Sequence, residues 1–254
     1  MAMAIGTEIE RLFSLDGRIA LVTGSAQGLG LVMARSLARC GAKVHLNGRD
    51  ASRLAEVRDR LAGEGLAVGI APFDVLDRDA GVAAVDKIVA TDGRLDILIN
   101  NAGPRLRRSI DDIDADGFAM MMDAHVAAPF RLARAAAESM KPGGWGRIVM
   151  LSSAAAVRGA KGDAAYTAAK GGVTALTRAL AAEYGSFGIT CNALIPGRFQ
   201  TESNANSTRG AGGVLGRSGD PDEIAGAAIF LCSPAASFVT ASTVTVDGGV
   251  SNCF

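Results

Sequence analysis

The chain has 254 residues, of which 49% are hydrophobic, and its 26 Lys and Arg residues balance its 26 Asp and Glu residues. This balance gives no general attraction to nucleic acid or to an anionic membrane, and the apolar content excludes a disordered chain. The length suits one α/β domain over residues 1–254 and leaves no room for a second full domain.

Residues 1–14 are interpreted as an N-terminal extension of this domain. They carry Glu8 and Glu10 and no long apolar segment, which is unlike a signal peptide or a membrane span. The four cysteines show no metal-ligand spacing; we expect three of them to be small buried residues in a reducing compartment. The sequence therefore predicts a cytoplasmic protein without a metal site.

Short β-branched and apolar runs alternate with helical patterns along the chain. The runs predict strands over residues 18–23, 43–47, 67–73, 95–100, 147–152, 188–195 and 242–247. Strands separated by helices favour a parallel sheet that is covered on both faces. We therefore predict a single doubly wound Rossmann-type α/β domain with a seven-stranded parallel sheet. A polar, Gly-rich stretch inside 198–215 predicts a substrate lid.

A glycine-rich turn, TGSAQGLG, follows the first predicted strand. Its glycines permit a tight turn and a close backbone approach, and the next helix offers free N–H groups and a positive dipole end to a diphosphate. The spacing is GxxxGxG rather than GxGxxG, and a purely architectural turn is the alternative. The residues expected to bind a cofactor here are Gly24, Ser25, Gln27, Gly28, Leu29 and Gly30.

The end of the second predicted strand bears on the choice of cofactor. An NAD-binding chain carries an acid about 20 residues after the glycine turn, where it holds the ribose 2′-hydroxyl. Here that position falls near Gly48, and Arg49 follows it. Because an Arg can hold a 2′-phosphate, NADP(H) is favoured, with NAD(H) as the alternative. Asp50 is expected to cap the next helix and could also reach the ribose.

Two further strand ends carry candidate cofactor contacts. Asp74 and Val75 follow the third predicted strand, and the Asp74 carboxylate could accept the adenine amino group or cap the next helix. Asn101, Ala102 and Gly103 follow the fourth predicted strand. Small residues there leave room for a ribose, and an Asn side chain can tie neighbouring strand ends together.

The stretch YTAAK places Tyr166 and Lys170 four residues apart, on one face of a predicted helix. A cation beside a phenol favours loss of the phenol proton, which suits proton exchange with a substrate. Ser153, after the fifth predicted strand, could hydrogen-bond a substrate oxygen. The pair by itself also fits a half-buried Tyr beside a solvated Lys.

Taken together, TGSAQGLG, NNAG, YTAAK, PGRFQT and VDGG resemble the short-chain dehydrogenase/reductase family, over the range from about Leu15 to Gly249. The resemblance implies a nicotinamide cofactor, with Tyr166 as general acid/base. It also implies that Tyr166 and Lys170 both bind the cofactor, Lys170 at the nicotinamide ribose. It also implies that Ser153 orients the carbonyl.

The same resemblance implies that Pro196, Gly197 and Thr201 line the nicotinamide end of the site. It further implies a homotetramer assembled through the Tyr166 helix, its neighbour and the C-terminal strand.

One residue departs from the family pattern. The family has a catalytic Asn that holds a water linking the active-site Lys to solvent, and this chain has His125 there. An imidazole could replace the Asn in proton relay and would bring a pH response near its own pKa of ~6.5. The alternative is a His that fills space and bonds a carbonyl. His45, on the second predicted strand, is expected to be a packing residue.

The substrate is indicated only by Arg105, Arg107 and Arg108, which follow the NNAG motif. These arginines could meet an anionic substrate or lie on a solvated surface. FSLDGRIALVTG with LNGRD resembles the gluconate 5-dehydrogenase-like branch, which acts on sugar acids such as 5-ketogluconate. We therefore predict hydride transfer between nicotinamide and a carbonyl or secondary alcohol of a small molecule. The alternatives are a 3-oxoacyl-carrier-protein reductase and a cofactor-binding regulatory protein with weak or no turnover.

Overall fold

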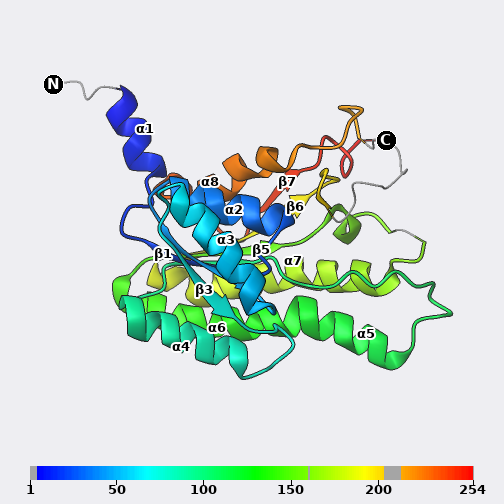
Figure 1. Cartoon of the computed structure of the whole chain (residues 1–254). Helices are drawn as coiled ribbons and strands as arrows, with labels where there is room; N and C mark the ends of the chain where they lie inside the picture. The colour runs from blue at the N-terminus through cyan, green and yellow to red at the C-terminus, as the bar shows by residue number, and fades with distance from the viewer. Residues whose placement is uncertain (1–4, 160, 203–212, 254) are drawn as a thin grey trace.

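The computed structural model describes residues 5–159, 161–202 and 213–253 (Figure 1). Across these ranges seven strands form one parallel sheet in the order β3-β2-β1-β4-β5-β6-β7. The strands are β1 Ile19–Val22, β2 Lys43–Gly48, β3 Val68–Pro72, β4 Ile97–Asn100, β5 Gly146–Leu151, β6 Ile189–Pro196 and β7 Thr243–Val246. All the predicted strands are confirmed, with ends that differ from the prediction by at most two residues.

Helices connect the strands and cover both faces of the sheet (Figure 1). One face carries α2 Gly28–Arg39, α3 Ala51–Gly63 and α8 Ala225–Cys232, and the other carries α4 Ala80–Asp92, α6 Ala128–Met140 and α7 Ala164–Tyr184. Before the sheet lies α1 Ile5–Phe13, and α5 Ala115–Met122 continues through the π-helical η1 Asp123–Ala127 into α6. Short 3₁₀ turns are η2 Lys141–Gly143, η3 Ala154–Ala156, η4 Gly185–Phe187, η6 Pro221–Ile224 and η7 Pro234–Ala236. The doubly wound arrangement is confirmed.

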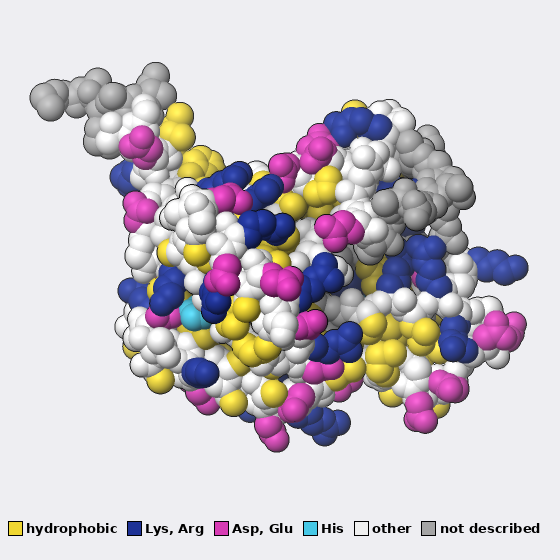
Figure 2. Space-filling view, in the orientation of Figure 1, with side chains coloured by type: hydrophobic (Ala, Val, Ile, Leu, Met, Phe, Trp, Pro, Cys, Tyr) yellow, Lys and Arg dark blue, Asp and Glu magenta, His cyan; other side chains and the backbone are white. Residues whose placement is uncertain are grey.

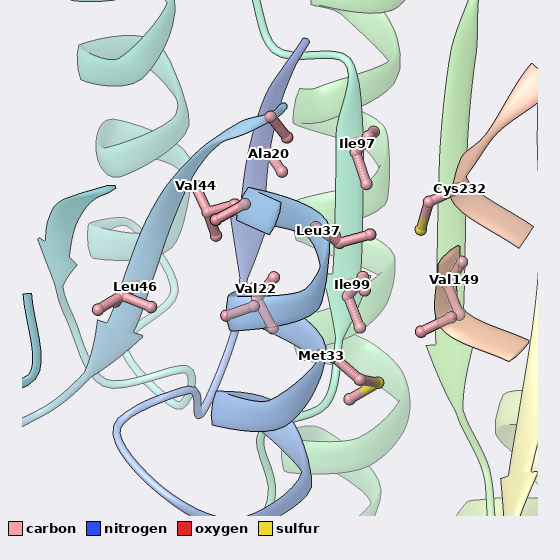
Figure 3. Close-up of a cluster of buried hydrophobic side chains, with 14 of the residues drawn as sticks. Ala20, Val22, Met33, Leu37, Val44, Leu46, Ile97, Ile99, Val149 and Cys232 are labelled. Atoms are coloured by element: carbon pink, nitrogen blue, oxygen red, sulfur yellow. The ribbon is translucent and has the colours of Figure 1, made fainter. Parts of the chain in front are cut away.

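Two apolar clusters lie on the two faces of the sheet. Along β1, Ala20 and Val22 enter one cluster while Leu21 enters the other, as the alternation of side chains along a strand requires. Figure 3 shows the first cluster, where the strands pack against Met33 and Leu37 of α2. Burial on both faces explains why the strands are almost continuously apolar.

The surface carries charges of both signs (Figure 2), and two of the four cysteines are buried where three were expected. On the face shown in Figure 2, Lys and Arg side chains are interspersed with Asp and Glu side chains. Cys191 and Cys232 are buried, whereas Cys40 is half-buried and Cys253 is exposed. In the part of the chain that the structure describes, no His, Cys, Asp and Glu side chains cluster in a way that could hold a metal ion. None of the described helices has the length and apolarity to cross a membrane.

The strand order determines where a ligand can bind. The chain runs outward from β1 to β2 and β3, then returns to the other side of β1 to form β4. Connections after β1 and β4 therefore leave in opposite directions and open a crevice at the carboxyl ends of the strands. The predicted site residues follow these strand ends.

Candidate active site

A cleft of about 1310 Å³ lies at the carboxyl edge of the sheet. The predicted residues that line it are Gly24, Gln27, Gly28, Leu29, Arg49, Asp74, Val75, Asn101, Ala102, Gly103, Ser153, Tyr166, Pro196, Gly197 and Thr201. The fold thus brings together residues from most of the strand ends. The other predicted site residues, Ser25, Gly30, His125 and Lys170, lie behind this lining.

The glycine turn has the geometry that its sequence predicted. Gly24 and Gly28 have φ angles of +62° and +58°, in the left-handed region that favours glycine. A Cβ at Gly30 would overlap the carbonyl oxygen of Gly24, so Gly30 allows α2 to pack closely on the turn. Ser25 is fully buried, and its hydroxyl donates to the Val22 carbonyl at 2.7 Å. Close packing at Gly30 and the Ser25 hydrogen bond therefore stabilise the conformation of the turn.

The N-terminus of α2 is open toward the cleft. Gln27 occupies the N-cap without a side-chain capping hydrogen bond, and the first turn contains no acidic residue. The first N–H groups of a helix have no partner within the helix, and the helix dipole favours an anion beside them. This turn therefore fits the diphosphate of a dinucleotide, because the glycines allow close backbone approach.

Partly buried hydrogen bonds join the turn to the end of β4. The side-chain nitrogen Nδ2 of Asn101 donates to the carbonyls of Thr23 at 2.9 Å and Gly24 at 3.1 Å. These bonds confirm that an Asn side chain ties the two strand ends together. The Thr23 hydroxyl accepts from the backbone N–H groups of Asn101 at 2.9 Å and Ala102 at 3.0 Å. These bonds fix the spacing between the two strand ends.

Asn47 makes a similar connection on the other side of β1, which no sequence motif had indicated. Its side-chain oxygen accepts from the Gly24 N–H at 3.1 Å. Its amide nitrogen donates to the carbonyls of Ala71 at 2.9 Å and Phe73 at 3.1 Å. The available signal was a polar residue at the end of an apolar strand, where a buried amide needs partners.

Arg49 and Asp74 lie together at the far end of the cleft. The Arg49 side chain is 81% exposed, and its Nη1 lies 3.7 Å from Oδ2 of Asp74. Oδ1 of Asp74 accepts from the Leu76 N–H at 3.0 Å, which closes a turn. The interpretation of Asp74 as a helix cap is wrong, because α4 begins further along the chain. Asp50 does cap α3, by accepting from the Arg53 N–H at 3.0 Å.

The predicted catalytic trio is assembled by α7 and the end of β5. Tyr166 and Ser153 line the cleft, and the Ser153 hydroxyl accepts from the Ala155 N–H at 3.2 Å. Lys170 is buried behind Tyr166, with its Nζ donating to the Leu151 carbonyl at 2.6 Å and lying 5.7 Å from the Tyr166 ring centroid. Burial lowers the pKa of Lys170 to about 7.

His125 lies in η1 and is only 2% exposed. Its Nε2 is 2.7 Å from the Pro104 carbonyl oxygen, and because a carbonyl only accepts, Nε2 carries the proton. Nδ1 is buried without a hydrogen-bond partner among the described residues. Burial, and then the charge of Lys170, lower the pKa of His125 from 6.5 to about 4. The pH response that the sequence placed near 6.5 is therefore corrected to about 4.

The arginines after β4 divide into two groups. Arg105 and Arg107 line the cleft, whereas Arg108 forms an isolated backbone bridge with Asp163. Nη2 of Arg105 donates to Oδ2 of Asp163 at 2.5 Å, and Nε of Arg107 lies 3.6 Å from Oδ1. The Arg105 guanidinium also lies 4.8 Å from the centroid of the Tyr166 ring. No sequence pattern had indicated Asp163.

The segment after β6 also lines the cleft and approaches the glycine turn. Pro196 ends β6, and Gly197 packs so closely that a Cβ there would lie 2.5 Å from the Cα of Asp247. The Thr201 methyl carbon is 3.9 Å from where a Cβ of Gly28 would lie. Residues 203–212 of the predicted lid lie outside the described residues.

His45 lies away from the cleft. Its Nε2 is 2.6 Å from Oδ2 of Asp92, which confirms it as a packing residue with a polar partner.

The chain matches known proteins over nearly its whole length. Residues 24–251 match the family model described as Enoyl-(Acyl carrier protein) reductase. The gluconate 5-dehydrogenase of Gluconobacter oxydans (strain 621H) is 40% identical over 250 residues, covering 94% of this chain and 96% of that protein.

Solved structures show the same similarity. A gluconate 5-dehydrogenase from Burkholderia cenocepacia J2315 in complex with NADP and tartrate has 37% identity and a TM-score of 0.92, covering 97% of this chain and all (100%) of that chain. A 3-oxoacyl (acyl-carrier-protein) reductase from Agrobacterium tumefaciens C58 with NADP bound has 29% identity and a TM-score of 0.92, covering 98% and 100%. This chain therefore belongs to the short-chain dehydrogenase/reductase family and is an NAD(P)-dependent oxidoreductase acting on CH–OH groups.

Proposed function

We propose that this protein is an NADP(H)-dependent oxidoreductase whose substrate is a keto-sugar acid, such as 5-ketogluconate, or the corresponding hydroxy acid. The observation that carries the proposal is the Arg105 guanidinium 4.8 Å from the Tyr166 ring centroid, in the cleft that Ser153 also lines. A guanidinium beside a phenol that exchanges protons suits a substrate bearing both a carbonyl and a carboxylate. The similarity to gluconate 5-dehydrogenases supports the same substrate class.

The preference for NADP(H) rests on the side chains around the ribose position. Arg49 is exposed beside the cleft and can turn from Asp74 toward a 2′-phosphate. Asp50, the acid that could reach a ribose 2′-hydroxyl, already caps α3. The Burkholderia cenocepacia relative is a complex with NADP, which agrees with this choice.

The proposed reaction uses the trio in distinct roles, while the bound nicotinamide supplies or accepts the hydride. Tyr166 gives a proton to the substrate oxygen on reduction and takes it on oxidation. Ser153 donates a hydrogen bond to the same oxygen and stabilises negative charge that develops there. Lys170, in its protonated form, binds the nicotinamide ribose from behind the phenol ring.

His125 takes the family's Asn position in this proposal. Its Nε2–H is already used by the Pro104 carbonyl, which leaves Nδ1 as a buried acceptor without a described partner. A neutral imidazole with this arrangement can hold a water through Nδ1 and so continue a proton path from Lys170. His125 acts here by accepting a hydrogen bond, without changing its own charge.

The first experiment is a fluorescence titration with NADPH and NADH, followed by turnover assays on keto-sugar acids, simple ketones and 3-oxoacyl thioesters. Tighter binding of NADPH and the highest kcat/KM on keto-sugar acids are expected. Equal affinity for the two coenzymes would count against the role of Arg49. A higher kcat/KM on uncharged ketones than on acids would refute the substrate class.

The same assays decide between the two alternatives. Similarity to the Agrobacterium tumefaciens 3-oxoacyl (acyl-carrier-protein) reductase keeps that activity as a second candidate, and it requires turnover of 3-oxoacyl thioesters. A regulatory cofactor-binding protein would bind NADPH and consume none with any carbonyl. The complete set of Ser153, Tyr166 and Lys170 argues against that alternative, because binding alone does not need a proton donor.

We also propose that the protein forms a homotetramer. Phe238, which precedes β7, is fully exposed, and Phe130 on α6 is 41% exposed. These side chains lie near the C-terminal strand and on the helix neighbouring α7, where the family resemblance places the subunit contacts. Size-exclusion chromatography with light scattering tests the assembly, and a monomer at micromolar concentration would contradict it.

A further inference from the structure

Asp163 stands at the N-cap of α7, but its carboxylate makes no capping hydrogen bond there. It is 3% exposed, and a buried carboxylate is costly unless it is paired. Its partners are Arg105 at 2.5 Å and Arg107 at 3.6 Å, both from the loop after β4. The carboxylate is therefore turned away from its own helix and toward that loop.

The loop residues 104–108, here called the arginine segment, are held at both ends. At one end the Pro104 carbonyl accepts from His125, and a Cβ on Gly103 would overlap the His125 ring. At the other end the backbone of Arg108 forms a bridge with the backbone of Asp163. Between these two ends, the Asp163 carboxylate holds the side chains of Arg105 and Arg107.

The result is a cation in a defined place beside Tyr166. The Arg105 guanidinium lies over the phenol ring, and the pair with Asp163 uses one of its terminal nitrogens. The Arg105 side chain is still 46% exposed, so other donors of its fork can be reached from the cleft. Arg105 can therefore contact Asp163 and a substrate anion at the same time.

We propose that Asp163 is a positioning residue that holds Arg105 beside Tyr166 for the carboxylate of an acidic substrate. This inference rests on the proposed function and deepens it. With the carboxylate bound to Arg105, the reacting carbonyl of the same molecule is oriented toward the phenol. A guanidinium that is already ordered loses less side-chain freedom when the anion binds.

A buried carboxylate could instead compete with the substrate for Arg105. Two observations favour positioning over competition. Arg107 approaches the second oxygen of Asp163, so the carboxylate is shared between two cations and does not pair with Arg105 alone. The pair with Arg105 involves one nitrogen and one oxygen, which leaves the rest of the guanidinium fork for a ligand.

The test compares Asp163→Asn with wild type on a keto-sugar acid and on an uncharged ketone. We expect kcat/KM for the acid to fall roughly 10- to 100-fold, because misplacement of a group that orients substrate has effects of that size. The value for the ketone should change by less than about threefold. Asp163→Glu should restore part of the loss on the acid. Asp111→Asn, the same change at an exposed carboxylate that does not line the cleft, is the matched control.

A double-mutant cycle identifies Arg105 as the group through which Asp163 acts. In an Arg105→Ala background, Asp163→Asn should cause no further loss on the acid. A full additional loss would overturn the proposal. So would a higher kcat/KM on the acid in Asp163→Asn, because that result means competition for Arg105.

A measurement without turnover separates this inference from the proposed function. In the NADPH complex, the amide hydrogens of the arginine segment should exchange faster in Asp163→Asn than in wild type, while those of β1 and α2 keep their rates. Unchanged NADPH affinity shows that the variant is folded. Unchanged exchange in the arginine segment refutes the positioning role of Asp163, even if keto acids are turned over. If exchange is faster in Asp163→Asn but the wild type reduces no keto acid, the positioning role of Asp163 is supported and the proposed function is refuted.

Discussion

The two ends of the cleft are built from different kinds of side chain. At the cofactor end, glycines and the neutral polar groups of Thr23, Asn47 and Asn101 fix the backbone through partly buried hydrogen bonds. At the substrate end, the partly exposed charges of Arg105 and Arg107 gather around one buried carboxylate. Hydrogen bonds between neutral groups depend little on salt, whereas the exposed charged groups respond to salt and to a charged ligand. The cofactor end should therefore be sensitive to added volume and the substrate end to altered charge.

Tyr166→Phe should give the largest difference between the two ends of the cleft, because it should lower turnover while NADPH binding is kept. The phenol is the proposed proton donor, and loss of general acid/base catalysis lowers rates roughly 100- to 10,000-fold. The NADPH dissociation constant should stay nearly unchanged, because the glycine turn and Arg49 are not altered. Steady-state turnover and fluorescence titration check the two statements. A variant that keeps a tenth of wild-type kcat would contradict the role of Tyr166.

Arg49→Ala tests the cation assigned to the 2′-phosphate at the cofactor end. Loss of a charge-assisted hydrogen bond to the 2′-phosphate should weaken NADPH binding roughly 10- to 100-fold and leave NADH within about twofold. Fluorescence titration of both coenzymes measures this. Arg58→Ala is the matched control, since Arg58 lies on the helix that follows Arg49, pairs with Asp59 and does not line the cleft. Equal loss of NADPH and NADH affinity would refute the 2′-phosphate assignment.

Gly30→Ala tests the sensitivity of the cofactor end to volume. The new Cβ would overlap the Gly24 carbonyl oxygen and lie 2.6 Å from the side-chain nitrogen Nδ2 of Asn101. Overpacking of this kind should lower the free energy of unfolding by about 1–3 kcal/mol, as measured by urea denaturation. Gly63→Ala is the control, because a Cβ at Gly63, at the end of α3, would meet no atom within 4 Å among the described residues apart from its chain neighbours and its own helix backbone. Equal stability of the two variants would contradict the close packing of α2 on the turn.

His125→Asn gives the smallest expected effect and concerns the boundary between the two ends. The pKa of His125 is about 4 in the folded protein against 6.5 as its ordinary value, so the unfolded chain binds a proton first on acidification. Stability from this group is complete above about pH 6.5 and is lost as the pH falls toward about 4. Between about pH 7.5 and pH 5.5 the wild type should lose roughly 1 kcal/mol that the Asn variant does not lose.

Urea unfolding of both proteins at the two pH values checks this difference. Parallel losses in both would show that His125 is not held neutral by burial. In the activity profile, no inflection near pH 6.5 is expected from His125, because the ring is already neutral there.

Much of the cofactor end could be predicted from sequence because its signals are local. The left-handed Gly24 and Gly28 follow from a glycine-rich turn between strand and helix. The Asp50 cap and the shared helical face of Tyr166 and Lys170 follow from spacings of a few residues. Backbone conformation and side-chain periodicity depend on near neighbours, so patterns of this length determine them.

The sequence by itself determined the strands, the glycine turn and the spacing of Tyr166 and Lys170. Only the tertiary structure decided which distant groups meet. Asp163 pairs with Arg105, which lies 58 residues earlier in the chain, and no local pattern relates them. The neutral state of His125 likewise depends on burial and on the charge of Lys170. The physical reason is that desolvation and ion pairing are set by the packing of separate elements, which a local pattern does not contain.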